Sequence, residues 1–257
     1  MSTVLFEVKD SVAYITLNRP EKYNAFNREM SLSIQQRLEE SKSSEIRCVH
    51  ITGAGKAFSS GQDLLEATNQ TGLTVNTIIK EHYNPIIQLI RNLEKPVLAA
   101  VNGIAAGAAA NIAICCDVVV AARSATFIQA FSKIGLIPDS AGTFFLPRLI
   151  GLQKASALCM LGDKVSADEA EKLGMIYKVF DDDTFVEESV RIANTLAQLP
   201  TKGLALTKRA LNESFKNTLE EQLQEEELLQ ERAAATHDFK EGINAFLEKR
   251  TPNFKGE

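Results

Sequence analysis

The sequence has no tryptophan, and its 257 residues include only three histidines and four cysteines. His50, His82 and His237 are too far apart along the chain to suggest a metal cluster, and none stands beside a candidate nucleophile. Cys115 and Cys116 are adjacent, which is poor geometry for a disulfide, so we expect buried, reduced thiols. These shortages argue against a metal centre and against a disulfide-stabilised fold.

Excess positive charge and uninterrupted apolar segments are also missing. The net charge of −5 and the pI near 5.4 argue against nucleic acid as a partner, because a phosphate-binding surface should be basic. The segment Met1–Glu7 lacks the basic and apolar regions of a secretory signal. Glycines and asparagines interrupt the longest apolar stretch, Val97–Cys116, as a membrane-spanning helix should not allow. We therefore expect a cytoplasmic protein with no membrane segment.

Nucleotide-binding glycine motifs are absent as well. The segment Thr52–Ala57 resembles a phosphate-binding loop only superficially, because His50 stands where the first glycine is needed and Ala57 where Ser or Thr is needed. The glycines of Gly103–Gly107 have the wrong spacing for a dinucleotide site. We expect a simple turn at the end of a strand in the first case.

Strands and helices alternate in the first part of the chain, which predicts an α/β protein. Asn27 can cap a helix that runs to about Ser41, and a second helix is predicted over Thr77–Leu93. The recurring strand, strand, helix order favours a stacked or spiral α/β core over 1–200, and the almost wholly helical pattern after Asp183 predicts a separate helical region over 201–257. Other expected elements are a hairpin (Val4–Val8 and Val12–Leu17), further strands (Arg47–Thr52, Val97–Val101 and Asp117–Ala121) and a buried helix (Ala108–Cys115).

Two small-residue turns and one aspartate carry the chemical argument. The turns Phe58–Asp63 and Asn102–Ala108 have the residues to offer backbone N–H groups to one developing oxyanion. Asp139 would then be the only carboxylate near that oxyanion. A site with one acid/base can move a proton, whereas a site that adds water usually needs two. From spacing alone, packing turns and an ordinary turn aspartate are the favoured interpretation.

A resemblance changes that interpretation. The segments Asn18–Phe26, Ala57–Leu64 and Pro96–Gly103 resemble the crotonase, or enoyl-CoA hydratase/isomerase, superfamily, and matches at Gly142–Thr143, Leu146–Arg148 and Phe246–Arg250 extend the similarity across the chain. The resemblance implies a spiral of ββα units, a helical C-terminal region that forms a homotrimer or a dimer of trimers, and acyl-CoA thioester substrates. It implies no cofactor, because coenzyme A belongs to the substrate.

The resemblance also assigns roles to individual residues. The oxyanion-hole donors would be the backbone N–H groups of Gln62 and Ala108, and Asp139 would be the catalytic acid/base. Phe246 and Lys249 would reach the ligand of a neighbouring subunit. The walls of the acyl pocket would come largely from the segment 66–85 and the C-terminal helices. The substrate-binding positions carried over are Lys22, Asn24, Ala25, Ser60, Asp63, Leu64, Phe131, Phe246 and Lys249.

Departures from the hydratase pattern indicate the reaction. The two glutamates that hydratases use to split water are replaced by Asn111 and Phe131, neither of which is an acid or base. The segment Ala130–Asp139 resembles the isomerases of phenylacetate catabolism, which convert a ring-epoxidised phenylacetyl-CoA to an oxepin and also shift enoyl-CoA double bonds. We expect Phe131, Ile137 and Leu136 to raise the pKa of Asp139.

Three alternatives remain from the sequence. The first is enoyl-CoA hydration, which Asn111 and Phe131 disfavour. The second is dehalogenation of an aromatic acyl-CoA, although Asn84 and Phe131 stand where those enzymes use histidine and tryptophan. The third is a non-catalytic acyl-CoA-binding protein, which would have no need of a carboxylate at Asp139.

Overall fold

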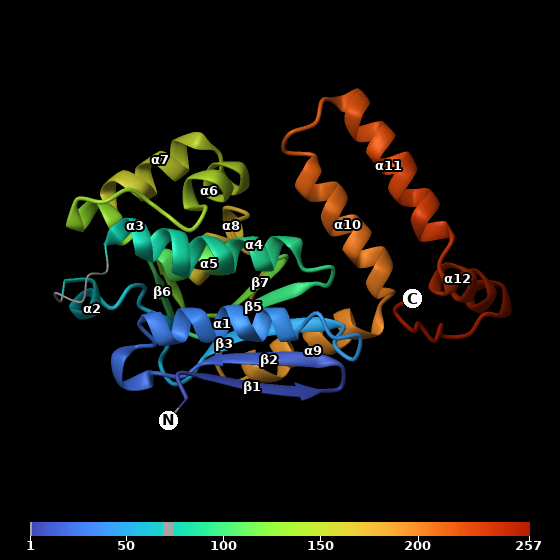
Figure 1. The fold of residues 1–257 in the computed structure, drawn as a ribbon, viewed down its shortest axis with the longest axis horizontal. Coiled ribbons are helices and arrows are strands. Elements are labelled where there is room, and N and C mark those ends of the chain that lie inside the picture. Colours follow the sequence, from blue (N-terminus) through green and yellow to red (C-terminus); the bar gives the residue numbers. More distant parts are fainter. Residues whose placement is uncertain (1, 69–73) are drawn as a thin grey trace.

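The structure, a computed structural model, describes residues 2–68 and 74–257 and contains two β-sheets flanked by helices (Figure 1). The larger sheet has six strands in the order β1-β2-β3-β5-β7-β10. Its first pair is an antiparallel hairpin and its remaining pairs are parallel. The strands are β1 (Val4–Lys9), β2 (Val12–Leu17), β3 (Cys48–Gly53), β5 (Val97–Val101), β7 (Val118–Ala122) and β10 (Lys178–Phe180).

The smaller sheet has four strands of three residues each in the order β4-β6-β8-β9. The pairs β4–β6 and β6–β8 are parallel, and β8–β9 is antiparallel. Each strand is too short to show an alternating pattern, and none was predicted from the sequence. The strands are β4 (Ala57–Ser59), β6 (Ile104–Ala106), β8 (Thr126–Ile128) and β9 (Lys164–Ser166).

Successive strand pairs run from one sheet to the other, which confirms the predicted spiral of ββα units. In β3–β4, β5–β6 and β7–β8, the first strand joins the larger sheet and the second joins the smaller one. The turn after β5 packs directly on the turn before β4, because a Cβ atom on Gly103 would lie 2.2 Å from the carbonyl oxygen of Lys56. Glycine is therefore needed where two such turns stack.

Local sequence signals account for the elements that were predicted. The side chain of Asn27 accepts a hydrogen bond from the Met30 N–H (2.9 Å) and begins α1 (Arg28–Glu40). Met30, Ile34 and Leu38 form its buried face. The strand β5 is buried at every position, as expected of a parallel strand covered on both faces.

The predicted helix over Thr77–Leu93 is instead three joined pieces: α3 (Val75–Thr77), a π-helical turn η2 (Ile78–Tyr83) and α4 (Asn84–Asn92). Pro85 explains the irregularity, because it has no N–H to donate to the carbonyl of Glu81. The side chain of Gln35 in α1 supplies that bond instead, at 2.8 Å. The widened turn ends at Tyr83, which is 1% exposed.

The remaining helices lie between the strands or follow them, and the last three extend away from the sheets (Figure 1). The chain leaves α9 at Gln198 and begins α10 at Thr201, where the predicted break falls. A division into regions 1–200 and 201–257 stays a prediction. The helices are η1 (Pro20–Lys22), α2 (Leu64–Thr68), α5 (Ala108–Ile114), η3 (Ala130–Ile134), α6 (Gly142–Ile150), α7 (Leu152–Leu161), α8 (Ala167–Lys172), α9 (Phe185–Gln198), α10 (Thr201–Glu213), α11 (Leu219–Ala234) and α12 (His237–Glu248).

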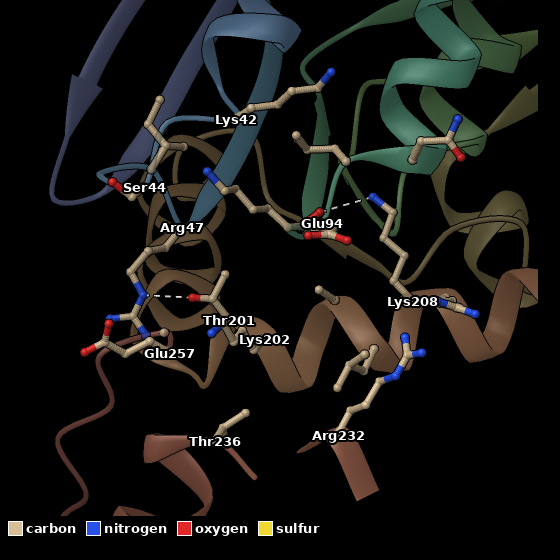
Figure 2. Close-up of a pocket in the computed structure, with 18 of the residues that line it drawn as sticks. Lys42, Ser44, Arg47, Glu94, Thr201, Lys202, Lys208, Arg232, Thr236 and Glu257 are labelled. Atoms are coloured by element: carbon tan, nitrogen blue, oxygen red, sulfur yellow. Dashed lines mark hydrogen bonds between the residues drawn. The ribbon is translucent and has the colours of Figure 1, made fainter. Parts of the chain in front are cut away.

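A groove of about 1090 Å³ separates these last helices from the core, and nine Lys or Arg side chains line it against three Glu (Figure 2). Its two buried lysines already have partners. Lys208 forms an ion pair with Asp117 (2.7 Å) and donates to the carbonyl of Ile90 (2.6 Å). Lys95 donates to the carbonyl of Ser41 (2.7 Å). The ammonium groups of these two lysines therefore bind carbonyl oxygens and a carboxylate of the protein itself, and so stabilise the ends of helices.

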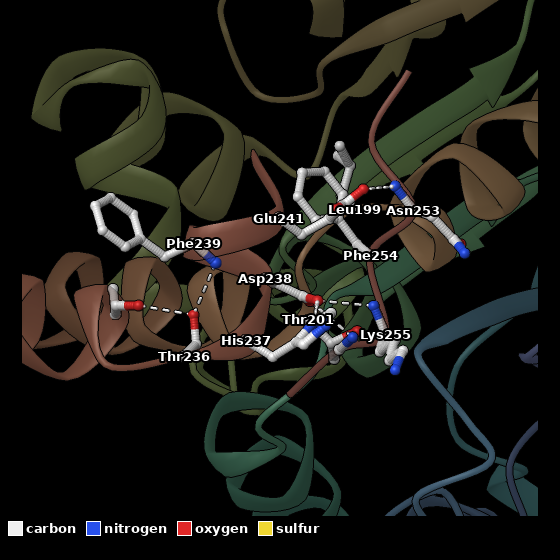
Figure 3. A network of polar contacts seen from close by, with 12 residues as sticks. Leu199, Thr201, Thr236, His237, Asp238, Phe239, Glu241, Asn253, Phe254 and Lys255 are labelled. Carbon is white, nitrogen blue, oxygen red and sulfur yellow. Dashed lines mark hydrogen bonds and ion pairs between the residues drawn. The ribbon is translucent and has the colours of Figure 1, made fainter. Parts of the chain in front are cut away.

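The last residues of the chain are fastened across this groove (Figure 3). Asp238, which is 2% exposed, accepts hydrogen bonds from the N–H groups of Lys255 and Gly256, both at 2.7 Å. Arg47 donates to Thr201 (2.9 Å) and to the carbonyls of Leu199 (2.7 Å) and Phe254 (2.9 Å). One arginine thus joins the core, the start of α10 and the end of the chain.

None of the described helices is both long and apolar enough to cross a bilayer.

Candidate active site

The two turns that were candidates for an oxyanion hole lie against each other. A Cβ atom on Gly61 would stand 2.7 Å from the carbonyl oxygen of Ala106 and 3.9 Å from the nitrogen of Ala108. Gly61 also has a φ of +88°, which glycine adopts without strain. Across the described residues, the N–H groups of Gln62 and Ala108 donate to no protein acceptor. The two amides are therefore close to one another and available.

Gln62 is held from both its backbone and its side chain. It forms an isolated parallel bridge with Phe26, through Phe26 N–H to Gly61 C=O (2.7 Å) and Asp63 N–H to Phe26 C=O (2.8 Å). Its side-chain oxygen accepts a hydrogen bond from the hydroxyl of Tyr83 at 2.6 Å. Three attachments fix the direction of the Gln62 amide, which is what a preorganised donor requires.

Asp139 carries a carboxyl group whose acidity is shifted by its surroundings. Burial raises the pKa of Asp139 to about 6, and the hydrogen bond from the Ser140 hydroxyl (2.9 Å) offsets part of that effect. The expectation that Ile137 and Leu136 provide this burial is wrong for the isolated chain, since their residues are 80% and 42% exposed. Phe131 is buried, and its ring lies beside Gly107, in the turn that leads to Ala108. A Cβ atom built on Gly107 would lie 3.8 Å from the Cζ atom of Phe131.

Asn111 and Tyr83 relate Asp139 to the two amides. Asn111 lies on α5, the helix that begins at Ala108, and donates to the main-chain oxygen of Asp139 at 2.9 Å. On the other side, burial and then the negative charge of Asp139 raise the pKa of Tyr83 well above its usual value. The Tyr83 hydroxyl in turn donates to the side chain of Gln62. Asp139 is therefore linked to Ala108 through Asn111 and α5, and its charge acts on the phenol that holds Gln62.

Sequence reasoning missed Tyr83 and Glu66. The charge of Glu66 also raises the pKa of Tyr83. A second carboxylate therefore lies near the site, whereas the sequence predicted Asp139 alone. The Glu66 carboxylate accepts hydrogen bonds from the Arg28 N–H at 3.0 and 3.2 Å and thereby caps α1. No local motif marks either residue, because both act through contacts with distant segments. The rest of the predicted pocket segment 66–85 is described except for 69–73.

The predicted coenzyme A segment 22–25 lies beside Ser60, whose N–H donates to the carbonyl of Tyr23 at 2.9 Å. Lys22 is exposed, whereas Ala25 is buried. Asn24 is fully buried, and its amide group donates to the carbonyls of Ala54 (2.9 Å) and Ala57 (2.8 Å). The Asn24 side chain therefore stabilises this loop through hydrogen bonds within the protein. A contact with the ligand would have to come from its neighbours in the segment.

Asp63 and Leu64 continue this edge of the site. Asp63 forms a largely buried ion pair with Arg19 at 3.0 Å, and Arg19 also donates to the carbonyl of Ala25 at 2.6 Å. Leu64 is 52% exposed. The arginine thus ties the first turn of the oxyanion site to the 22–25 segment.

Phe246 and Lys249 stand apart from this cluster in a single chain. Both belong to the end of α12, at the far side of the C-terminal helices from the segment around α2 and α3 (Figure 1). Phe246 is 83% exposed. Their predicted contact with the ligand of another subunit stays a prediction.

The histidines and cysteines have structural surroundings. His50 contacts Ser189 at 3.2 Å inside the core, and burial lowers its pKa to about 4. His82 is buried with Arg28 at 3.3 Å from its ring, on the side of η2 that faces α1. Burial raises the pKa of Cys48 to about 12, so its thiol stays protonated. In the described ranges there is no cluster of three or more metal-ligating side chains.

Comparison with known proteins gives a consistent family. The sequence model described as enoyl-CoA hydratase/isomerase matches residues 7–257. The chain is 44% identical over 261 residues to the 1,2-epoxyphenylacetyl-CoA isomerase of Escherichia coli K12, with 100% of both proteins covered. It is 42% identical to a probable enoyl-CoA hydratase of Rhodobacter capsulatus, with 99% and 98% covered. The crystal structure of an enoyl-CoA hydratase from Bacillus anthracis superposes with a TM-score of 0.92 at 32% identity, covering 99% of this chain and 100% of that one.

Proposed function

Since the chain belongs to the enoyl-CoA hydratase/isomerase family, we propose that it isomerises an acyl-CoA thioester through an enolate, with Asp139 as the single acid/base. The observation that carries the proposal is the link of Asp139, through Asn111 on α5 and through its charge on Tyr83, to the segments that hold the free amides of Ala108 and Gln62. Coenzyme A enters as part of the substrate.

The proposed reaction starts at the thioester carbonyl. Its oxygen accepts hydrogen bonds from Gln62 N–H and Ala108 N–H, which lowers the pKa of the proton on C2. Each preorganised donor contributes about 3–4 kcal/mol to such a transition state. The Asp139 carboxylate takes the C2 proton, and the electron pair moves onto the carbonyl oxygen.

The same carboxyl group then completes the isomerisation. With a 3-enoyl substrate the electrons form a dienolate, Asp139 returns its proton to C4, and the double bond ends between C2 and C3. No atom is gained or lost, and the carboxylate is regenerated. A pKa of about 6 suits both steps, because the group is ionised at neutral pH and still gives its proton back readily.

The ring-epoxidised phenylacetyl-CoA is the second substrate we propose, on the strength of the 44% identical relative that is named for it. Its C2 carries an acidic proton next to the thioester, so the first step is the same. Loss of that proton would place electron density beside the ring that must open. The phenylacetate pathway is the setting in which such a substrate arises.

Hydration is the competing proposal, because another relative is named a hydratase. The two positions at which hydratases use glutamate hold an amide and a phenyl ring, Asn111 and Phe131, and both are buried. Glu66 is the other carboxylate near Tyr83, but its oxygens are engaged by Arg28. Water addition would therefore need a base that we do not assign.

The deciding experiment uses three probes with the wild type, Asp139→Asn and Glu66→Gln. We expect mass-neutral conversion of cis-3-hexenoyl-CoA and exchange of the C2 protons of phenylacetyl-CoA in D2O. Both should be lost in Asp139→Asn and kept in Glu66→Gln, with little hydration of crotonyl-CoA. Activity should fall below about pH 6 as Asp139 becomes protonated.

Each other result has a definite meaning. Rapid hydration of crotonyl-CoA that survives Asp139→Asn would replace the isomerase by a hydratase. The absence of conversion, exchange and hydration together would favour a non-catalytic acyl-CoA-binding protein.

We also propose that three copies, or two sets of three, assemble through the C-terminal helices. The support is a set of large apolar side chains on α10–α12 and on the connection between α10 and α11 that are exposed in the isolated chain, which a solvated arm would not need. They are Leu211, Phe215, Leu219, Leu223, Phe239, Ile243, Phe246 and Leu247.

A further inference from the structure

A chain of buried side-chain amides runs behind Asp139. Asn111 is 0% exposed and Gln129 is 3% exposed. The Nε2 of Gln129 donates to the Oδ1 of Asn111 at 2.8 Å, and the Nδ2 of Asn111 donates to the main-chain oxygen of Asp139 at 2.9 Å. The three residues lie in segments that are distant in the sequence, and the two hydrogen bonds connect these segments.

We propose that Asn111 is a positioning residue for Asp139, and that the amide at this position is a required part of the one-base site rather than the remnant of a lost glutamate. The inference rests on the proposed function, since it assigns a role in presenting the proposed base. Asn111 does not touch the carboxylate itself, and acts by fixing the peptide that carries it.

The hydrogen bonds at position 111 suit a side-chain amide, which accepts from Gln129 and donates to Asp139. The main-chain oxygen of Asp139 is an acceptor only, so the group that faces it must donate. That oxygen also accepts from the Gly142 N–H at 2.9 Å, so its two bonds fix the orientation of the peptide that follows Asp139. An aspartate or glutamate at position 111 would turn a buried negative charge toward this oxygen, which is unfavourable.

The segment that Asn111 holds is one that would not keep its shape alone. Ser140 has a φ of +49° and Ala141 a φ of +60°, two consecutive non-glycine residues in the left-handed region. Each such residue costs on the order of 1–2 kcal/mol. A turn with that cost keeps its conformation only where neighbouring contacts impose it, and the bond from Asn111 is placed to do so.

The surrounding packing leaves no space for a longer side chain at position 111. A Cβ atom on Gly142 would lie 2.2 Å from the Nδ2 of Asn111 and 2.6 Å from its Oδ1. The amide head therefore rests directly on the first residue of α6. A longer glutamate would have to displace that helix or the Gln129 side chain, so Asn111→Glu should not create a hydratase.

The test is an isosteric change with a matched control. Asn111→Asp keeps the shape and loses the donor where the new carboxyl is ionised, so the pH range extends to alkaline values; Asn92→Asp makes the same change at an exposed site. The readout is C2 deuterium exchange of phenylacetyl-CoA and conversion of cis-3-hexenoyl-CoA across a range of pH. We expect kcat about 10- to 100-fold lower with KM within about twofold, because a small misplacement of a catalytic group has effects of that size.

The pH profile separates positioning from loss of folded enzyme. A negative charge close to Asp139 disfavours ionisation of its carboxyl, so the acid limb should move upward from about pH 6 in Asn111→Asp. Simple unfolding would lower kcat without moving the limb. An unshifted limb with normal kcat would overturn the inference.

Gly142→Ala is the second variant, in case Asn111→Asp does not fold. Alanine is the better helix former, so α6 should not be weakened, yet the new methyl group must push the Asn111 amide away. We expect the same fall in kcat at unchanged KM, and wild-type kinetics in this variant would also overturn the inference. If Asp139→Asn keeps its activity, the proposed function is wrong. If Asp139→Asn loses its activity while Asn111→Asp has wild-type kinetics, only the proposed role of Asn111 is wrong.

Discussion

At the scale of single residues, Asp139 should lower the stability of the protein in order to serve as a base. Its pKa is raised to about 6 in the folded state, so the folded protein prefers the neutral carboxyl. The penalty for ionising it is full above about pH 6 and is absent below the unfolded pKa near 4. It amounts to about 2–3 kcal/mol at most.

Asp139→Asn removes this penalty, and we expect the variant to melt at a higher temperature than the wild type at pH 8. The gain should shrink steadily as the pH falls from 6 toward 4. Differential scanning calorimetry of both proteins over this range measures it. Asp163→Asn, the same substitution at an exposed site, serves as the control. A constant difference at all pH values would mean that the carboxyl is not shifted.

Tyr83 is the other residue whose role follows from its contacts. Its hydroxyl is the donor that fixes the side chain of Gln62, and its ring packs edge-on against Phe26. Tyr83→Phe keeps the ring and removes only that donor. We expect about a 10-fold lower kcat at similar KM, because one preorganising hydrogen bond is lost. Tyr177→Phe, at a side chain that is 66% exposed, is the control, and equal kinetics in the two variants would contradict the assignment.

At the scale of elements, the sequence predicted those whose signal is local. The hairpin, the capped helix α1 and the buried strand β5 each carry their pattern within a few consecutive residues. The recurring strand, strand, helix order favoured a stacked or spiral core, and the family resemblance added the ββα unit and the positions of the site. The strands of the smaller sheet were not predicted, because three residues are too few to show the two-residue alternation of a strand.

The irregular parts of the site were not predicted either, for a different reason. The π-helical turn η2 depends on Pro85 together with Gln35, a side chain from another helix. The role of Asn111 depends on Gly142 and on a turn with two positive φ values. Such features are properties of contacts between distant segments, so one sequence does not reveal them.

The junction made by Arg47 is an element-scale feature with a measurable effect. Arg47→Ala would leave the carbonyls of Leu199 and Phe254 without this donor and would free the start of α10. We expect a loss of about 2–4 kcal/mol in the free energy of unfolding, because hydrogen bonds from a charged donor are lost together. Urea denaturation measures it.

The control for this loss is an arginine at the surface. Arg191 is 61% exposed in its side chain and pairs with Glu188 within one helix. Arg191→Ala should change the unfolding free energy by less than about 0.5 kcal/mol. If the two variants are equally stable, Arg47 does not fasten the C-terminal region.

At the scale of the whole molecule, the distribution of the site residues predicts an active site shared between chains. Asp139 and the free amides lie on the core, whereas Phe246 and Lys249 lie on α12 with their side chains outward. A contact of these two residues with the substrate is reasonable only if another copy supplies them. In a closed ring of three copies, every site would then combine the core of one chain with α12 of its neighbour.

Mixing two inactive variants tests this arrangement. Asp139→Asn damages the core part of a site and Lys249→Glu damages the α12 part, so each homogeneous protein should have little activity. If the parts come from different chains, co-expression in equal amounts should restore about a quarter of the sites, because one site in four pairs an intact core with an intact α12. If both parts came from the same chain, every site would keep one defect and mixing would restore nothing. Light scattering on the mixed sample fixes the number of copies, and full activity of Lys249→Glu alone would remove α12 from the site.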